Sequence, residues 1–407
     1  MSPATPLYLY DDATARAFEP FALTRPVSEL RAGAEIIRRR WEMALGLRAA
    51  GAITAPHLAD FAESGAPPAA RDAIPAGAVI ANSRFAPALN ASARAATANV
   101  WMSGGRVAAV RTESAIPPGM LADGTMGLNK IRPATGSMTE LGGSWLEEVW
   151  QLVTLLLPML RDDIDALGPT LERVPPEPAT VLGTHSVHVE RGATVEPHVV
   201  FDVTAGPVLL LAGSTVRAFS RLVGPCFVGT GSMILGDRVH GCSIGEHSVI
   251  RGEISETIVL GHANKGHEGF VGHSVLGRWV NLGAGTITSN LKNTYGSVPL
   301  WTPGGVRDSG ALKLGAFFGD HVKTGIGARF TTGSVIGAGS NVYGSAMPPR
   351  HVPPFSWGEG DALGEYRVEE FLRTTERAMA RRGVPLSDSM KRQLRAAHAL
   401  GRANARA

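Results

Sequence analysis

The stretch Val271–Gly283 reads V-G-H-S-V-L-G-R-W-V-N-L-G and repeats one small pattern, an aliphatic residue followed directly by glycine. The pair recurs from Val223 to Gly337, and Leu276 and Leu282 are six residues apart. A period of six is typical of hexapeptide repeats, in which each hexad makes one short strand and one turn. Stacked coils then bury aliphatic side chains that a single repeat cannot bury. Residues 181–345 are therefore predicted to form a left-handed parallel β-helix, with glycine at corners of positive φ.

The region before the repeats has the texture of an α/β domain. Leu7–Tyr10 is a short apolar strand, and residues 51–130 alternate short strands with Ala/Pro/Gly-rich loops. Helices are expected over Ser28–Leu45 and over Leu141–Leu167, where Pro158 kinks or ends the helix. A linker is then marked by three prolines, Pro175, Pro176 and Pro178. We therefore predict a first domain over residues 1–175.

The composition and charge of the chain argue against a nucleic-acid-binding protein, a disulfide-rich protein and a membrane protein. Residues 360–407 are predicted to form a helical tail, and from 366 onward this tail carries ten Arg or Lys against four acids. The net charge is only +3, so the rest of the chain is slightly acidic and has no body-wide basic patch for nucleic acid. Two cysteines, Cys226 and Cys242, are too few for a disulfide framework. Without a secretory signal or an apolar run of membrane-spanning length, a cytoplasmic protein with no membrane partner is expected.

One segment carries a specific resemblance. His262–Asn290 reads H-A-N-K-G-H-E-G-F-V-G-H-S-V-L-G-R-W-V-N-L-G-A-G-T-I-T-S-N, and His267 precedes Asn281 by fourteen residues. This pattern resembles the acetyltransferase half of the bifunctional N-acetylglucosamine-1-phosphate uridylyltransferase and glucosamine-1-phosphate N-acetyltransferase family. Further runs resemble a divergent bacterial branch of that family: Ser289–Tyr295, Gly319–His321 and Leu23–Val27.

The resemblance implies a sugar-phosphate N-acetyltransferase that takes its acetyl group from acetyl-CoA. His267 stands where the family keeps its general base, and a pKa near 7 suits the removal of a proton from a sugar amine. Asn281 and Asn290 match positions that bind the sugar and hold the acyl donor. Phe270 replaces a family Tyr and cannot donate a hydrogen bond, so contacts to the sugar phosphate must differ. The resemblance also implies a homotrimer, with each site between adjacent β-helices.

A sugar phosphate also requires cations. Lys292 is the first candidate, within a segment, Ser289–Gly310, whose prolines and glycines break the period and predict a projecting loop. The other candidates lie in or beside the matching coils: Arg251, Lys265, Arg278 and Lys323.

The first domain resembles a sugar nucleotidyltransferase of Rossmann-like fold. Such folds place a phosphate-binding loop directly after the first strand. Here Asp11–Arg16 takes the place of the glycine-rich loop. Arg16 and Arg25 are the predicted nucleotide-binding residues, and Asp11 and Asp12 the predicted Mg²⁺ ligands, with UTP as the nucleotide. Because the glycines are missing, we expect nucleotide transfer to be weak or absent.

Two other functions are compatible with the same fold. In γ-class carbonic anhydrases, zinc lies between β-helix subunits on three His ligands, two of them five residues apart. His262 and His267 have that spacing, and a third ligand would come from His240, His247 or His273. The third reading is a non-catalytic trimeric scaffold that binds a sugar nucleotide.

Overall fold

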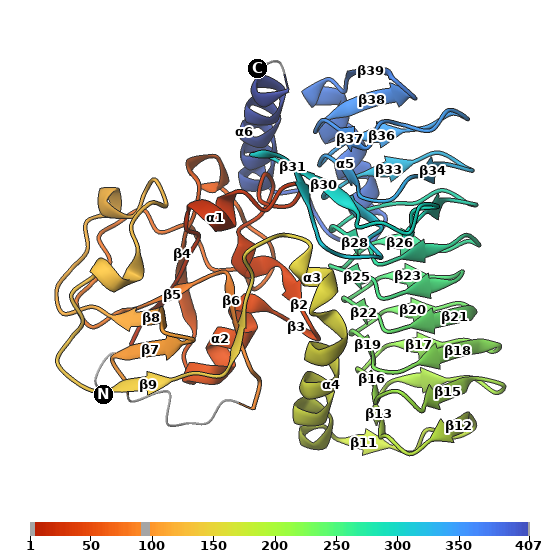
Figure 1. Cartoon of the computed structure of the whole chain (residues 1–407), viewed down its shortest axis with the longest axis horizontal. Coiled ribbons are helices and arrows are strands. Elements are labelled where there is room, and N and C mark those ends of the chain that lie inside the picture. Colours follow the sequence, from red (N-terminus) through yellow and green to blue (C-terminus); the bar gives the residue numbers. More distant parts are fainter. Residues whose placement is uncertain (1–4, 91–97, 406–407) are drawn as a thin grey trace. The chain divides into compact units, whose positions relative to one another are not determined.

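The computed structural model describes residues 5–90 and 98–405, which form two compact units (Figure 1). The first unit contains residues 1–18, 22–149 and 386–400. The second contains residues 19–21, 150–385 and 401–407. Within the described residues, no helix combines the length and the apolar character needed to cross a membrane.

The first unit is built on a six-stranded mixed sheet. Its order is β4 (Ala49–Ile53), β1 (Leu7–Tyr10), β5 (Val79–Asn82), β8 (Arg106–Arg111), β7 (Val100–Ser103) and β9 (Met138–Glu140). β1 runs parallel to both β4 and β5, so the carboxyl ends of these three strands meet at one edge of the sheet. The smaller elements are α1 (Ala13–Arg16), β2 (Arg31–Ala32), β3 (Glu35–Ile36), α2 (Ile37–Leu45), β6 (Phe85–Pro87) and β10 (Gly143–Trp145).

Both helices that the sequence predicts in this part of the chain begin later than expected. The segment before α2 forms the β2–β3 hairpin, because Gly33 adopts a φ of 63° and turns the chain back on itself. The second helix is interrupted at Leu155, which separates α3 (Gln151–Thr154) from α4 (Leu156–Leu167). Pro158 lies in the first turn of α4, where its missing N–H is not required.

The second unit is the predicted parallel β-helix, and three strand columns form its faces. The first face contains β13 (Val187–Glu190), β16 (Val208–Leu210), β19 (Cys226–Val228), β22 (Ser243–Ile244), β25 (Ile258–Val259), β28 (Val275–Leu276), β32 (Ala316–Phe318), β35 (Ser334–Ile336) and β37 (His351–Val352). The second contains β12 (Thr180–Gly183), β15 (Val200–Val203), β18 (Ser220–Val223), β21 (Asp237–His240), β24 (Ile254–Ser255) and β27 (Val271–Gly272), then β29 (Ile287–Thr288) and β34 (Arg329–Phe330).

The third face carries three of the predicted site residues, Lys265, Asn281 and Lys323. It contains β14 (Thr194–Val195), β17 (Thr215–Val216), β20 (Met233–Ile234), β23 (Val249–Ile250) and β26 (Asn264–Lys265), and, beyond a bridge at Asn281, β33 (Lys323–Thr324), β36 (Asn341–Val342) and β38 (Ser356–Glu359). Inward-facing aliphatic side chains from all three faces form one continuous core. The coils differ in length, since Ser243 pairs with Ile258, and Ile258 pairs with Val275.

Glycine has a different role from the one expected in most of the aliphatic–glycine pairs. A Cβ on Gly245 would lie 2.4 Å from the carbonyl oxygen of Leu260, and one on Gly277 would lie 2.6 Å from the nitrogen of Asp320. These two positions have no positive φ, so close approach of the next coil excludes a side chain there. The positive φ at this corner belongs to non-glycine residues: His247, His262, Trp279, His321 and Phe355.

The segment Ser289–Gly310 leaves the β-helix as predicted and folds into a hairpin of β30 (Pro299–Thr302) and β31 (Gly305–Asp308). The two ends of the β-helix are marked by antiparallel strands, β11 (Arg173–Val174) on β13 and β39 (Ala362–Glu365) on β38. The predicted helical tail forms α5 (Val368–Ala380) and α6 (Asp388–Asn404).

Candidate functional site

Three polar side chains point outward from neighbouring coils of the third face. Asn264, Asn281 and Lys323 pair in register, and the amide of Asn264 donates to Oδ1 of Asn281 over 3.0 Å. Because side chains alternate along a strand, the next residues, Lys265 and Thr324, point inward. Asn281 is exposed, as a substrate-binding residue needs to be.

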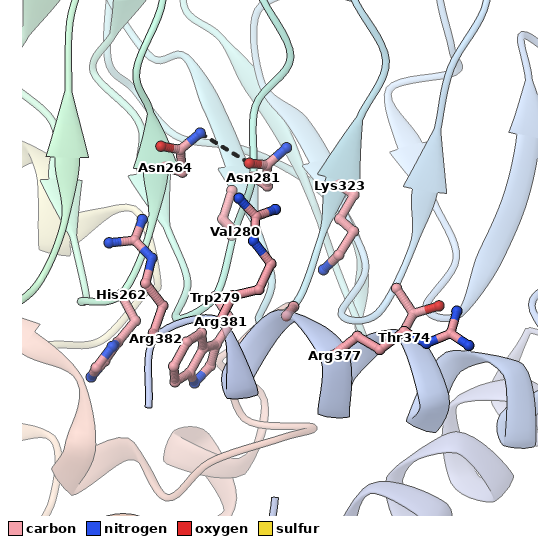
Figure 2. A pocket seen from close by; sticks show the side chains of 11 residues that line it. His262, Asn264, Trp279, Val280, Asn281, Lys323, Thr374, Arg377, Arg381 and Arg382 are labelled. Carbon is pink, nitrogen blue, oxygen red and sulfur yellow. Dashed lines mark hydrogen bonds between the residues drawn. The ribbon is translucent and has the colours of Figure 1, made fainter. Parts of the chain in front are cut away.

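A pocket of about 420 Å³ adjoins these residues, and α5 forms its opposite wall (Figure 2). We call it the basic pocket. Its positively charged residues are Lys323 from the β-helix and three arginines from α5 and the turn after it: Arg377, Arg381 and Arg382. Among the described residues, no carboxylate lines this pocket. Four cations without a lining acid create a positive potential that favours an anionic ligand, and guanidinium groups suit phosphate.

The floor of the basic pocket belongs to a stack of rings along the corner between the first and third faces. The ring centroids of His247 and His262 are 5.0 Å apart, and His262 stacks on Trp279 at 4.3 Å. Trp279 lies parallel to His321 at 6.5 Å, and His321 meets Phe371 of α5 edge-on at 5.9 Å. This corner stack therefore holds the wall and the floor of the basic pocket together.

His267 lies at the opposite edge of the third face from this stack. It follows β26, whereas His262 precedes the same strand, and its side chain is exposed. The two histidines of the zinc alternative thus occupy opposite edges, and His262 is engaged in ring stacking. In the parts of the chain that the structure describes, no three His, Cys, Asp or Glu residues are grouped to hold a metal ion. A zinc site would need ligands from a second chain.

The predicted phosphate-binding cations have different surroundings. Lys265 is 1% exposed and donates from Nζ to the carbonyl oxygens of Arg251 at 3.2 Å, Glu268 at 3.0 Å and His267. This burial lowers the pKa of Lys265 to about 8. Three other predicted cations also contact groups of this chain. Arg251 forms an ion pair with Asp237, Arg278 forms one with Glu246, and Lys292 donates a hydrogen bond to the carbonyl oxygen of Ser297. Lys323 is the predicted cation that lines the basic pocket.

Asn290 is part of a hydrogen-bonded chain at another corner. Its amide donates to Nδ1 of His273 over 2.9 Å, and Nε2 of His273 lies 3.3 Å from Oε1 of Glu256. The hydrogen bond from His273 is the main cause that lowers the pKa of Glu256. Glu256 and His273 line a separate pocket of about 440 Å³ with α3, α4 and Lys313. The side chain of Asn290 therefore anchors the root of the projecting hairpin.

The first unit has a pocket of about 440 Å³ at the carboxyl ends of β1 and β5. Its lining includes Asp12, Asn82, Arg84, Arg106 and Trp145. The guanidinium carbon of Arg106 lies 4.0 Å from the ring centroid of Trp145, as in a cation–π contact. Ligands commonly bind outside the carboxyl ends of parallel strands, so this edge is where a nucleotide is expected.

The predicted Mg²⁺ ligands do not fit the ion. Both carboxylate oxygens of Asp12 accept from the guanidinium of Arg84, at 2.8 Å each, and Asn82 also donates to Oδ2 at 2.8 Å. Asp11 is buried and accepts from the hydroxyl of Thr54 at 2.8 Å, and burial raises its pKa to about 6. A guanidinium thus stands where a divalent cation would be held.

The two predicted nucleotide-binding arginines make internal contacts. Arg16 donates to the carbonyl oxygens of Asp11 at 3.0 Å and Ala122 at 2.7 Å. Arg25 is 2% exposed and makes a bidentate pair with Glu63. Arg84 and Arg106, which the sequence did not single out, are the arginines that line the pocket.

The sequence also gave no indication that the tail contributes to the basic pocket. Arg377 of α5 and Arg381, the residue that caps its carboxyl end, are one helical turn apart, a spacing that places both side chains on the same side of the helix. That spacing could have indicated a shared binding surface, but a basic helix whose charged face is simply exposed to solvent has the same pattern. The sequence did not predict that Trp279 lines the pocket, because the repeat pattern indicates only that this residue lies at a corner of the β-helix.

The chain thus combines an α/β unit with a parallel β-helix. Residues 7–170 match the family model described as sugar nucleotidyl transferase. The chain is 38% identical over 100 residues to a bifunctional sugar-1-phosphate nucleotidylyltransferase/acetyltransferase of Sulfurisphaera tokodaii, covering 25% of each chain. It is 30% identical over 195 residues to the bifunctional protein GlmU of Desulfitobacterium hafniense, covering 41% of this chain and 39% of that protein.

These matches confirm the resemblance that the motifs predict: parts of the chain are similar to bifunctional GlmU and sugar-1-phosphate nucleotidylyltransferase/acetyltransferase proteins. It aligns with about two fifths or less of the length of each of these relatives. Among solved structures, an N-acyltransferase of Bacillus cereus, AntD, covers 48% of this chain and 89% of its own, at 14% identity and a TM-score of 0.20. A score that low carries no argument about this chain.

Proposed function

We propose that the β-helix unit is a sugar-phosphate N-acetyltransferase that uses acetyl-CoA. The observation that carries this proposal is the basic pocket, which places four cations beside the exposed Asn281. Both proposed substrates carry phosphate groups, so a pocket lined by arginines and a lysine suits either of them. The run Val280–Asn290, with its resemblance to acetyltransferases, supports the same assignment.

His267 is the proposed general base. Attack of a sugar amine on the thioester requires removal of a proton, and an exposed imidazole is the side chain that most often accepts one in enzymes. The new C–N bond then forms as the C–S bond breaks, and CoA leaves as the thiol. Asn281 is one coil along from the strand that leads to His267, so it can orient the same substrate.

Removal of the imidazole tests this assignment. We expect His267→Ala to lower acetyl transfer from acetyl-CoA to glucosamine 1-phosphate by about 10²–10⁴-fold, the usual cost of losing a general base. The measurement is CoA release in steady state, with thermal unfolding recorded on the same samples. His185→Ala, which removes another exposed histidine of the β-helix, is the matched control. Near-wild-type transfer by His267→Ala would exclude the proposed role.

We propose that the first unit binds a sugar nucleotide but transfers nucleotide poorly. Its pocket lies outside the carboxyl ends of parallel strands, where ligands commonly bind, yet Arg84 pairs with Asp12 and no glycine-rich loop follows β1. Incubation with UTP, Mg²⁺ and N-acetylglucosamine 1-phosphate should release little pyrophosphate. Rapid release that Arg16→Ala abolishes would show that the Asp11–Arg16 turn does the work of the missing loop.

A further inference from the structure

Lys323 is placed unusually for a surface lysine. It points outward from β33, pairs with Asn281 in the next coil and donates from Nζ to the carbonyl oxygen of His321 at 3.3 Å. Figure 2 shows its amino group directed toward α5, into the basic pocket. The ammonium is therefore held in the pocket that suits either phosphate-bearing substrate of the proposed function, acetyl-CoA included.

Lys323 differs from the other cations of the pocket in being able to lose its proton. Arginine keeps its proton at any accessible pH, so in a pocket shared with Arg377, Arg381 and Arg382 the lysine is the group that can lose one. Burial of its amino group lowers the pKa of Lys323 to about 8. A lysine desolvated by burial is a recognised nucleophile.

We propose that Lys323 is itself an acyl acceptor, and that the protein acetylates this residue when acetyl-CoA is bound and no sugar acceptor is present. The amine attacks the thioester carbonyl, the C–N bond forms, the C–S bond breaks, and the amine's proton goes to the departing CoA thiolate. This inference rests on the proposed function in one respect, since it requires acetyl-CoA to occupy the basic pocket.

The expected selectivity follows from proton occupancy. At pH 8, about half of a lysine population with a pKa of 8 is neutral, against about 0.3% for the ordinary value of 10.5. The lower basicity reduces the intrinsic reactivity by about tenfold for a Brønsted slope near 0.4–0.5, the range known for thiols. Lys323 should therefore react about tenfold faster than an ordinary lysine before any gain from bound acetyl-CoA.

Acetylation would also change the pocket. An amide is neutral, so the pocket would keep three guanidinium groups and lose the one cation that the β-helix contributes. Phosphate-bearing ligands should then bind more weakly. The modification would make acetyl transfer self-limiting when the acceptor is scarce.

The test uses the full-length protein and acetyl-CoA without any sugar. Peptide mass spectrometry would follow acetylation at pH 7, 8 and 9 on each of the six lysines in the chain. Lys130 and Lys313 are exposed and serve as internal controls. We expect Lys323 to be acetylated at least tenfold faster than either control, and Arg381→Gln to slow only the reaction at Lys323. Equal rates at all three lysines would overturn the inference.

Two further readouts separate this inference from the proposed function. Sugar acetylation without preferential modification of Lys323 would overturn the inference and leave the proposed function intact. Preferential modification without sugar acetylation would support acetyl-CoA binding and contradict the proposed acceptor. p-Nitrophenyl acetate is the chemical control, because it carries no phosphate for the arginines to bind and should modify Lys323 with little dependence on Arg381.

Discussion

Replacement of Gly245 by alanine should destabilise the β-helix strongly. The added Cβ would lie 2.4 Å from the carbonyl oxygen of Leu260 and 2.6 Å from that of Val259. Since ordinary contact begins near 3.4 Å, the two coils would have to separate by about 1 Å. Overpacking of this kind costs about 1–3 kcal/mol. The separation also weakens the hydrogen bond that the Gly245 amide donates to Val259 over 2.8 Å, which adds about 1 kcal/mol.

The expected loss for Gly245→Ala is therefore about 3 kcal/mol, or a fall of about 1 M in the urea midpoint. Far-UV circular dichroism during urea unfolding measures it. Gly304→Ala is the matched control in the same unit, because its nearest neighbour, Oγ1 of Thr302, would lie 3.8 Å from the new Cβ. If the urea midpoints of Gly245→Ala and Gly304→Ala differ by less than about 0.2 M, the argument that a side chain at Gly245 would clash with the next coil is wrong.

Three further predictions concern packing, ionisation and assembly. Trp279→Ala should cost about 3 kcal/mol by urea unfolding, because the ring is buried within the corner stack. The pKa of Asp11 is raised to about 6 in the folded protein, so its protonated form stabilises the fold and this contribution is lost between about pH 4 and 6. Asp11→Asn should therefore flatten a decline in unfolding free energy over that range. Light scattering should give the mass of a homotrimer rather than about 43 kDa.

The sequence predicted best where a pattern depends on local spacing. Leu7–Tyr10 is the first strand, and the aliphatic–glycine pairs do mark a parallel β-helix. The predicted helix over Ser28–Leu45 was wrong in its first half, because the turn at Gly33 allows a short hairpin to replace helix. Apolar periodicity alone cannot show where a chain reverses.

The site was harder to predict because distant segments build it. The arginines of α5 and of the turn after it line the basic pocket, although the charge of this tail suggested only a solvated surface. Lys265 lies on the inward-facing side of its strand, whereas Lys323 lies on the outward-facing side of its own strand. The sequence could not distinguish these two positions, because the coils differ in length and the repeat therefore does not fix which residues face inward. His267 and Asn281 remain predicted site residues, and both are exposed.

The projecting hairpin offers a place to change the protein without changing its coils. Its roots are tied together, since the amide of Leu314 donates to the carbonyl of Asn290 over 2.9 Å, and Leu291 bridges Lys313. Because the two ends of this segment are held together by these contacts, a change in the hairpin beyond them does not alter how the coils stack. The turn at Pro303–Gly304 should therefore accept an inserted peptide, such as an affinity tag or a binding epitope, displayed from the side of the β-helix.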